Sequence, residues 1–207
     1  MTMETRNSPL LGVVILGAGA SSRMGRPKLL LPWRDTTVIG QIIRQWRELG
    51  AAQIGVVHRP NDTALFSELD RLTFSTRDRI ENPQPERGMF NSVICAASWP
   101  GWQKGISSWA VALGDQPHLR SGTLRTLLEF HAVHAGAICQ PLFEDHGRHP
   151  VILPRTAFEQ LKTTHAETLK EFLKLVACPS LPCSAGDPGL AFDLDTPEDY
   201  KRANASI

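Results

Sequence analysis

A run of small residues followed by cations lies near the start of the sequence. Residues 17–22 read GAGASS, and Arg23, Arg26 and Lys28 follow directly. Small residues let successive backbone N–H groups close around an anion, as a nest of amide dipoles. The neighbouring cations add full positive charge and further hydrogen-bond donors. The pattern predicts a loop that binds a polyphosphate.

Two aspartates far apart in the sequence are candidates for holding a cation against that polyphosphate. Asp115 follows the apolar run 109–113 in the segment Gly-Asp-Gln-Pro, whose composition also suits an ordinary turn. Mg²⁺ prefers oxygen ligands, so we expect Asp115 to bind it. Asp193 lies within the apolar stretch 190–194 (LAFDL), where a carboxylate is costly unless it is paired or bound to a metal.

The elements that must position these residues alternate between strands and helices. Apolar runs predict strands at 11–16, 53–58, 109–113, 137–139 and 190–194. Helical periodicity or cap residues predict helices at 38–49, 63–71 and 89–97, and helices beginning near Ser121, Pro154, Thr164 and Pro197. This alternation is typical of a parallel sheet covered by helices, which binds ligands beyond the carboxyl ends of its strands.

Two better-known glycine loops fit the sequence less well. A Walker A loop needs four residues between its glycines and then Gly-Lys-Ser/Thr, whereas five residues separate Gly19 from Gly25 here and Arg26-Pro27-Lys28 follows. A dinucleotide fingerprint needs a third Gly or Ala where this chain has Ser22. Pro27 biases Arg26 away from helical geometry, so the loop should stay irregular up to Lys28.

The segment L-x-A-G-x-S-x-R-M-G-x-P-K, residues 16–28, resembles the signature loop of the MobA-like NTP transferases. Within that superfamily it resembles the molybdenum cofactor cytidylyltransferases most. The resemblance implies an α/β protein with a three-layer α/β/α, Rossmann-like fold, whose sheet is mostly parallel with a small antiparallel portion. It also implies one nucleotidyltransferase domain over residues 1–207, in which we expect residues 1–9 to form a flexible tail.

The resemblance assigns nucleotide-binding residues at two places. Around the loop they are Leu16, Gly17, Ala18, Gly19, Ser21, Arg23 and Lys28, of which Arg23 and Lys28, together with Asp115, are also assigned to catalysis. Farther along, residues 80–92 (IENPQPERGMFNS) resemble the segment that approaches the base and ribose, so that Asn82, Gly88 and Ser92 would contact the nucleoside. A capped junction between a loop and a helix is the alternative for this second segment.

The metal and acceptor sites are implied in the same way. Asp115 and Asp193 would hold Mg²⁺, or Mn²⁺ in its place, with Asp195 as the less favoured second ligand. Residues 145–151 (DHGRHPV) resemble an acceptor-binding element, which makes Gly147, Arg148 and His149 candidate contacts unless the segment is simply a hairpin tip. Arg148 stands where a glycine is usual, and residues 163–166 replace a Gly-Asp-x-Gly turn, so the acceptor stays open.

The activity implied is transfer of CMP from CTP to the phosphate of molybdenum-bearing molybdopterin, with release of pyrophosphate. The alternative within the enzyme class is a guanylyl- or other nucleotidyltransferase acting on molybdopterin or on a sugar or polyol phosphate. Guanylyl relatives typically read L-A-G-G, whereas this chain reads Leu16-Gly17-Ala18-Gly19, which matches the cytidylyl type at its third position only. The alternative from another class is a non-catalytic partner of a molybdoenzyme that binds nucleotide or cofactor.

Bulk composition excludes several classes of protein. The length of 207 residues and the 42% hydrophobic content are enough for one sizeable core. A net charge of +1 argues against nucleic-acid and membrane partners, and no apolar run approaches a membrane span. The four cysteines form no C-x-x-C pair, which favours a reduced, cytoplasmic protein. Its expected partners are small molecules, with a molybdoenzyme or its chaperone as recipient of the product.

Overall fold

The computed structural model describes residues 10–20 and 24–205. The expected tail at 1–9 and two predicted nucleotide-binding residues, Ser21 and Arg23, lie outside the described residues. The strands are β1 (Leu10–Leu16), β2 (Pro32–Trp33), β3 (Thr36–Thr37), β4 (Gln53–His58), β5 (Arg79–Glu81), β6 (Ile106–Leu113), β7 (Ile138–Phe143), β8 (His146–Gly147), β9 (Val151–Pro154) and β10 (Ser180–Ser184). The α-helices are α1 (Val38–Glu48), α2 (Thr63–Arg71), α3 (Met89–Ser98), α4 (Ser121–Val133), α5 (Arg155–Gln160), α6 (Leu169–Leu175) and α7 (Pro197–Ala205).

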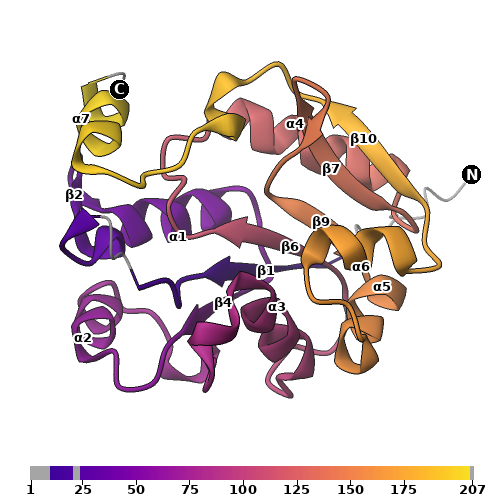
Figure 1. The fold of residues 1–207 in the computed structure, drawn as a ribbon, viewed down its shortest axis with the longest axis horizontal. Helices are drawn as coiled ribbons and strands as arrows, with labels where there is room; N and C mark the ends of the chain where they lie inside the picture. The colour runs from indigo at the N-terminus through magenta and orange to yellow at the C-terminus, as the bar shows by residue number, and fades with distance from the viewer. Residues whose placement is uncertain (1–9, 21–23, 206–207) are drawn as a thin grey trace, which may run out of the picture.

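The main sheet has the strand order β10-β7-β9-β6-β1-β4-β5 (Figure 1). β1 pairs in parallel with both β4 and β6, and β4 pairs in parallel with β5. β9 runs antiparallel between β6 and β7, while β7 forms an antiparallel hairpin with β8 and a parallel pair with β10. The predicted sheet, mostly parallel with a small antiparallel portion, is confirmed.

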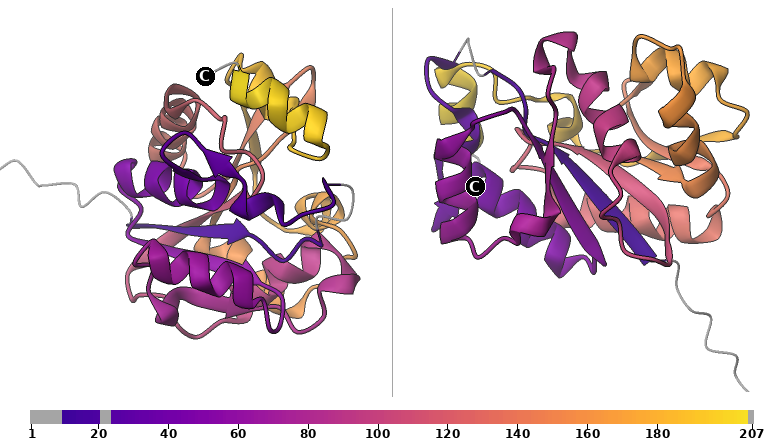
Figure 2. Two further views of the ribbon diagram at one scale, coloured as in Figure 1. Left: turned by 90° about the vertical axis from the view of Figure 1, so that its left-hand side faces the viewer. Right: turned by 90° about the horizontal axis from the view of Figure 1, so that it is seen from below.

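β1 lies at the centre of the sheet because both of its faces are apolar. Val13 and Ile15 pack on one face, in a cluster that includes the buried residues of α1 and α4. Val14 and Leu16 pack on the other, with α3, α5 and α6. This alternation is what the two-residue period of a strand requires when helices cover both faces. Figure 2 shows helices above and below the sheet, which is the expected three-layer arrangement.

The first two helices begin and end as their cap residues predict. The side chain of Asp62 accepts a hydrogen bond from the backbone N–H of Leu65 at 3.3 Å and starts α2. α1 starts after Thr37, whose hydroxyl accepts from the N–H of Gly40 at 3.2 Å. Gly50, just beyond α1, has a φ of +84°, a left-handed conformation that favours glycine. These local signals fix the helices that pack beside β1.

The strand predicted at 190–194 is wrong. Residues Pro188–Ala191 form a 3-10 helix, which Asp187 caps by accepting a hydrogen bond from the N–H of Gly189 at 2.9 Å. Leu190 and Leu194 are the buried residues of this stretch, and their four-residue spacing does not follow the alternation of a strand. Asp193 therefore lies on an irregular segment that crosses the end of the sheet, and not inside a strand.

Two helix starts also differ from the prediction. The helix predicted to begin near Thr164 begins one turn later, where Thr168 accepts a hydrogen bond from the N–H of Glu171 at 3.1 Å and starts α6. Ser121 is the first residue of α4 and not its cap, since the cap position belongs to Arg120 and carries no side-chain bond. Neither shift moves an element away from the site. None of the helices in the described ranges combines the length and apolarity that a membrane crossing requires.

Candidate active site

The carboxyl ends of β1, β4 and β6 are tied together through two glycines. Gly17 donates its N–H to the carbonyl of Val57 at 2.8 Å, and Gly114 donates to the carbonyl of Leu16 at 3.1 Å. A Cβ would lie 2.9 Å from the Val57 oxygen at the first position and 2.6 Å from the Leu16 oxygen at the second. Glycine is therefore required at both places for the backbones to approach.

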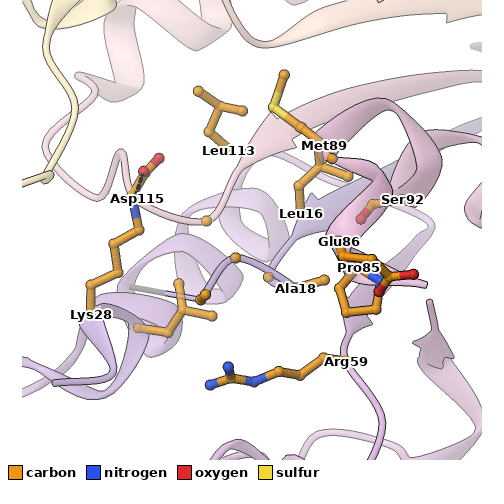
Figure 3. Close-up of a pocket in the computed structure, with 16 residues that line it drawn as sticks. Leu16, Ala18, Lys28, Arg59, Pro85, Glu86, Met89, Ser92, Leu113 and Asp115 are labelled. Carbon is orange, nitrogen blue, oxygen red and sulfur yellow. Dashed lines mark hydrogen bonds and ion pairs between the residues drawn. The ribbon is translucent and has the colours of Figure 1, made fainter. Parts of the chain in front are cut away.

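A cavity of about 480 Å³ opens beyond these strand ends (Figure 3). Gly19 differs from Gly17, because a Cβ built on it meets no atom of residues 10–20 or 24–205 within 4 Å. Those residues do not demand glycine there, so the small residue leaves the backbone accessible to a ligand. The residues that line the cavity are Leu16, Gly17, Ala18, Gly19, Ala20, Lys28, Leu29, Arg59, Pro85, Glu86, Gly88, Met89, Ser92, Leu113, Gly114 and Asp115.

Lys28 and Asp115 form an ion pair at one end of the cavity, where Figure 3 shows the two side chains pointing toward each other. Lys28 begins a 3-10 helix (Lys28–Leu30) that follows the glycine loop, and Asp115 lies just beyond β6. The ammonium group also lies 3.5 Å from Oδ1 of Asp195. The side chains of Lys28 and Asp115 are only 17% and 15% exposed, so water screens their charges much less than at an open surface.

Asp193 lies near this ion pair, because it contacts Gln116, the residue after Asp115. The amide Nε2 of Gln116 donates to Oδ1 of Asp193 at 2.9 Å. Part of the Asp193 side chain is exposed, but the surrounding walls displace enough water to raise the pKa of its carboxyl group. The negative charge of Asp115 raises this pKa further, and the bond from Gln116 opposes the shift. The two aspartates predicted to share a cation are thus close enough to repel each other.

The donor set fits a hard divalent cation. Among the described residues, the ammonium group of Lys28 contacts the carboxylates of Asp115 and Asp195, and the carboxyl group of Asp193 is near enough for the charges of all three to affect its pKa. Within residues 10–20 and 24–205, no three His, Cys, Asp or Glu side chains are grouped tightly enough to hold a metal alone. Mg²⁺ at nucleotide sites typically takes one or two carboxylates and completes its shell with substrate phosphates and water. Asp115 and Asp193 are suitable for that role.

The opposite end of the cavity is formed by the turn before α3. Asn82 is fully buried there: its amide donates to Oγ of Ser92 at 2.9 Å, and its oxygen accepts from the N–H of Gln84 at 2.9 Å and from Asn91 at 2.7 Å. Asn82 thus holds the turn together from behind. Gly88 and Ser92 line the cavity itself, and Gly88 has a φ of +90° that favours glycine. Of the three residues assigned to the nucleoside, two face the cavity.

The three residues assigned to the acceptor do not line the cavity. Gly147 ends β8, and Arg148 and His149 lie in the turn between β8 and β9. His149 donates its Nδ1–H to the carbonyl of Val111 at 3.1 Å, because a carbonyl can only accept. Burial lowers the pKa of His149, while the nearby charges of Asp193 and Asp115 work in the opposite direction. Arg148 has a buried Nε without a hydrogen-bond partner in the described parts of the chain. Gly147 is exposed, and a Cβ on it would meet the side chain of Gln140.

Other residues of the site were missed from the sequence. Arg59, Pro85, Glu86 and Met89 line the cavity, and Gln116 contacts Asp193. Arg59 could have been found, because it follows β4, the strand next to β1, at the same edge of the sheet. Glu86 and Met89 carry no such signal, since their placement depends on how the turn before α3 folds back over the loop.

Two of the curated proteins that match this chain do so to different extents. The molybdenum cofactor cytidylyltransferase of Escherichia coli (strain K12) is 25% identical over 190 residues, which is 90% of this chain and 92% of that protein. The bifunctional protein GlmU of Clavibacter sepedonicus is 30% identical over 126 residues, or 60% of this chain. The chain spans 25% of the length of that bifunctional relative.

Solved structures support the same fold. The Rv0371c protein of Mycobacterium tuberculosis H37Rv is 26% identical, with a TM-score of 0.72, 96% of this chain covered and 100% of that one. A manganese complex of the same protein also matches, at 25% identity, a TM-score of 0.67 and the same coverage of both chains. A nucleotidyl transferase of Methanothermobacter thermautotroptrophicus is 19% identical, with a TM-score of 0.76 over 95% of this chain and 97% of that one, a likeness of fold.

The family profile described as MobA-like NTP transferase domain matches residues 13–180. That range includes the glycine loop, Lys28, Asp115 and the whole cavity. The chain belongs to the family of MobA-like NTP transferases.

Proposed function

We propose that this protein, acting as a single nucleotidyltransferase domain, transfers CMP from CTP to the phosphate of molybdenum-bearing molybdopterin. In this reaction an oxygen of the acceptor phosphate attacks the α-phosphorus of CTP. The bond from that phosphorus to the bridging oxygen breaks, and pyrophosphate leaves with its electron pair. The choice of CTP and of the acceptor is supported by the likeness to a cytidylyltransferase along nearly the whole chain.

The observation that carries the proposal is the ion pair of Lys28 and Asp115 at the end of a glycine-lined cavity. Two reacting phosphates repel each other, so catalysis of their reaction consists largely of positioning and charge neutralisation. A cation and an acid paired at one end of the cavity can supply both. A module that only bound nucleotide would have no need for a second carboxylate, Asp193, whose pKa is raised by burial and by the neighbouring charge of Asp115.

We assign the triphosphate to the loop Leu16–Ala20, with Ser21 and Arg23 as further contacts. Backbone N–H groups there would bind the phosphate oxygens, and the open space over Gly19 leaves room for their approach. Lys28 would exchange its contact with Asp115 for one with the triphosphate and offset the charge that develops as pyrophosphate leaves. The base and ribose would lie over Gly88 and Ser92.

Asp115 and Asp193 would hold Mg²⁺, or Mn²⁺ in its place. The bound ion would neutralise phosphate charge and polarise the α-phosphorus. Asp195 is the alternative second ligand, and its contact with Lys28 instead suggests that it orients the lysine. Manganese in the complex of the mycobacterial relative supports use of a divalent metal in this fold.

The acceptor would enter from the side of β8 and β9. Arg148 carries a buried Nε without a partner in the described parts of the chain and could bind the attacking phosphate. His149 would stay neutral at pH 7 and present its Nε2 as a hydrogen-bond acceptor, because Nδ1 is already bonded to Val111. We expect the product to pass to a molybdoenzyme or its chaperone in the cytoplasm, where the four free cysteines would stay reduced.

The proposal is tested by pyrophosphate release from each of CTP, GTP, UTP and ATP, with Mg²⁺ and a molybdopterin acceptor. We expect release with CTP, and little with the other nucleotides. Release with GTP alone would replace the cytidylyl assignment by a guanylyl one, and release only with sugar or polyol phosphates would replace the acceptor. Nucleotide binding without any release would support a non-catalytic binding partner instead.

A further inference from the structure

Gln116 is buried in the wall of the site, and its amide group is not fully satisfied. The residue is only 4% exposed, and its Nε2 lies 2.9 Å from Oδ1 of Asp193 and 3.5 Å from the carbonyl oxygen of Phe192. Both neighbours can only accept hydrogen bonds, so the nitrogen must face them and the oxygen must point the other way. That oxygen, Oε1, is buried and has no hydrogen-bond partner among the described residues.

This arrangement is unfavourable for folding alone. A buried carbonyl oxygen without a donor loses its hydration and gains nothing in return. An apolar side chain of similar length would fill the same space without that cost. Asp193, in contrast, has an exposed surface and could be hydrated by water if Gln116 were absent. The bond between them is therefore not required to satisfy the carboxylate.

What the bond does supply is a fixed orientation. Asp193 lies on an irregular segment without strand pairing, so no backbone ladder holds its side chain in place. Gln116 directly follows Asp115. The connection after β6 thus carries both Asp115 and the amide group that restrains Asp193. Partners of this kind orient metal-binding side chains and tune their affinity.

We infer that Gln116 is a positioning residue for the divalent cation: its amide fixes Asp193 opposite Asp115, at some cost to stability. This inference rests on the proposed function, because it assumes that the two aspartates hold the ion. It goes further in assigning a role to a residue that is not part of the cavity lining. It also predicts that removal of the amide weakens metal binding without lowering the melting temperature.

The test compares Gln116→Met with Gln45→Met. Gln45 is a matched control, since it is also 4% exposed and its amide donates to the carbonyl of Leu119, at 2.6 Å, in the connection that begins at Gly114. Binding of Mn²⁺ is followed by the loss of the free-ion EPR signal, in the presence of a CTP analogue with a non-hydrolysable α–β bridge. Melting temperature without metal, and pyrophosphate release at saturating metal, are measured on the same samples.

We expect Gln116→Met to weaken Mn²⁺ binding by ~10-fold or more. Its melting temperature should be unchanged or higher, and its kcat at saturating metal should stay within about threefold of wild type. Gln45→Met should lower the melting temperature and leave Mn²⁺ binding unchanged, because the satisfied hydrogen bond that it removes goes to a backbone carbonyl and not to a carboxylate.

Three results would overturn the inference. Equal Mn²⁺ binding by Gln116→Met and wild type, with pyrophosphate release retained, would reject the role of Gln116 and leave the proposed function intact. A lower melting temperature without weaker metal binding would show that Gln116 acts only in folding. If the wild-type protein neither binds Mn²⁺ nor releases pyrophosphate, the proposed function fails first, and the role of Gln116 fails with it.

Discussion

The two ends of the cavity are built differently. At the charged end, Lys28 and Asp115 are paired and mostly buried, and Gly17 and Gly114 hold together the strand ends beside them. At the other end lies Met89, the first residue of α3, which is 49% accessible to solvent. Preorganised charges act on a transition state, whereas an exposed apolar surface contributes mainly to binding. The charged end should therefore control turnover, and the opposite end should control affinity.

The largest effect should come from Lys28. We expect Lys28→Ala to lower kcat at least ~100-fold, because the substitution removes a positive charge that offsets the charge of the departing pyrophosphate. Pyrophosphate release measures the effect, and circular dichroism checks the fold. The exposed Lys104 provides the control, since Lys104→Ala should behave as wild type. Near-normal turnover of Lys28→Ala would remove the lysine from the mechanism.

Asp115→Asn should cause a loss of comparable size, at least ~100-fold in turnover, because the amide keeps the shape but removes the charge that binds the cation. A matched control is Asp35→Asn, since Asp35 is also paired, with Arg44 at 2.8 Å, but on an open surface. There we expect less than about a twofold change. Equal effects of the two substitutions would mean that the ion pair at the cavity has no special function.

Much of the charged end can be predicted from the sequence, because its signals are local. A β-branched run followed by small residues and cations specifies both the strand and the loop, and Lys28 and Asp115 do lie together as the hypothesis requires. The cap residues of α2 and the glycine after α1 specify helix ends in the same way.

The rest of the site depends on contacts between distant segments. The assignment of Asp193 to the metal assumes that it lies in a strand, yet it lies on an irregular segment. Its carboxylate accepts a hydrogen bond from Gln116, which is 77 positions away in the sequence. The position of Glu86 and Met89 over the cavity follows from the network behind Asn82, which no periodicity reveals. Asn82 itself has residue types on either side that favour a loop, but only the packing shows that it is fully buried.

Substitutions at the two glycines of the loop should have different effects. One should lower the stability of the protein, and the other should weaken nucleotide binding. Gly17→Ala forces a Cβ to within 2.9 Å of the Val57 carbonyl and should destabilise the protein by about 1–3 kcal/mol. The Cβ of Gly19→Ala meets no atom of the described residues within 4 Å, so this variant should keep its melting temperature. It should raise the KM for nucleotide ~10-fold, equivalent to about 1.4 kcal/mol. Thermal melts and steady-state kinetics of both variants measure this. Unchanged KM in Gly19→Ala would place the triphosphate elsewhere.

Met89→Ala should have a smaller effect, confined to affinity. Losing part of an exposed apolar contact should raise the KM for nucleotide by about threefold with kcat unchanged. Initial rates over a range of nucleotide concentrations separate the two constants. A drop in kcat without a change in KM would contradict the division between the two ends of the cavity.

The smallest effect should concern His149 and pH. Burial holds the pKa of His149 below its ordinary value of 6.5, so the unfolded chain takes up this proton more readily than the folded one. The contribution of His149 to stability is full above pH 6.5 and is lost as the pH falls below it. His149→Gln should flatten this part of the profile of melting temperature against pH. An unchanged slope would mean that His149 titrates normally.

The central claim is that one divalent cation binds between Asp115 and Asp193, across from a triphosphate held by the glycine loop. A crystal structure with Mn²⁺ and a CTP analogue tests it directly, because manganese can be located by its anomalous scattering. The account predicts one manganese peak in contact with both carboxylates and with phosphate oxygens that the N–H groups of Gly17–Ala20 bind. Manganese away from these aspartates, or a triphosphate lying outside the loop, would contradict it.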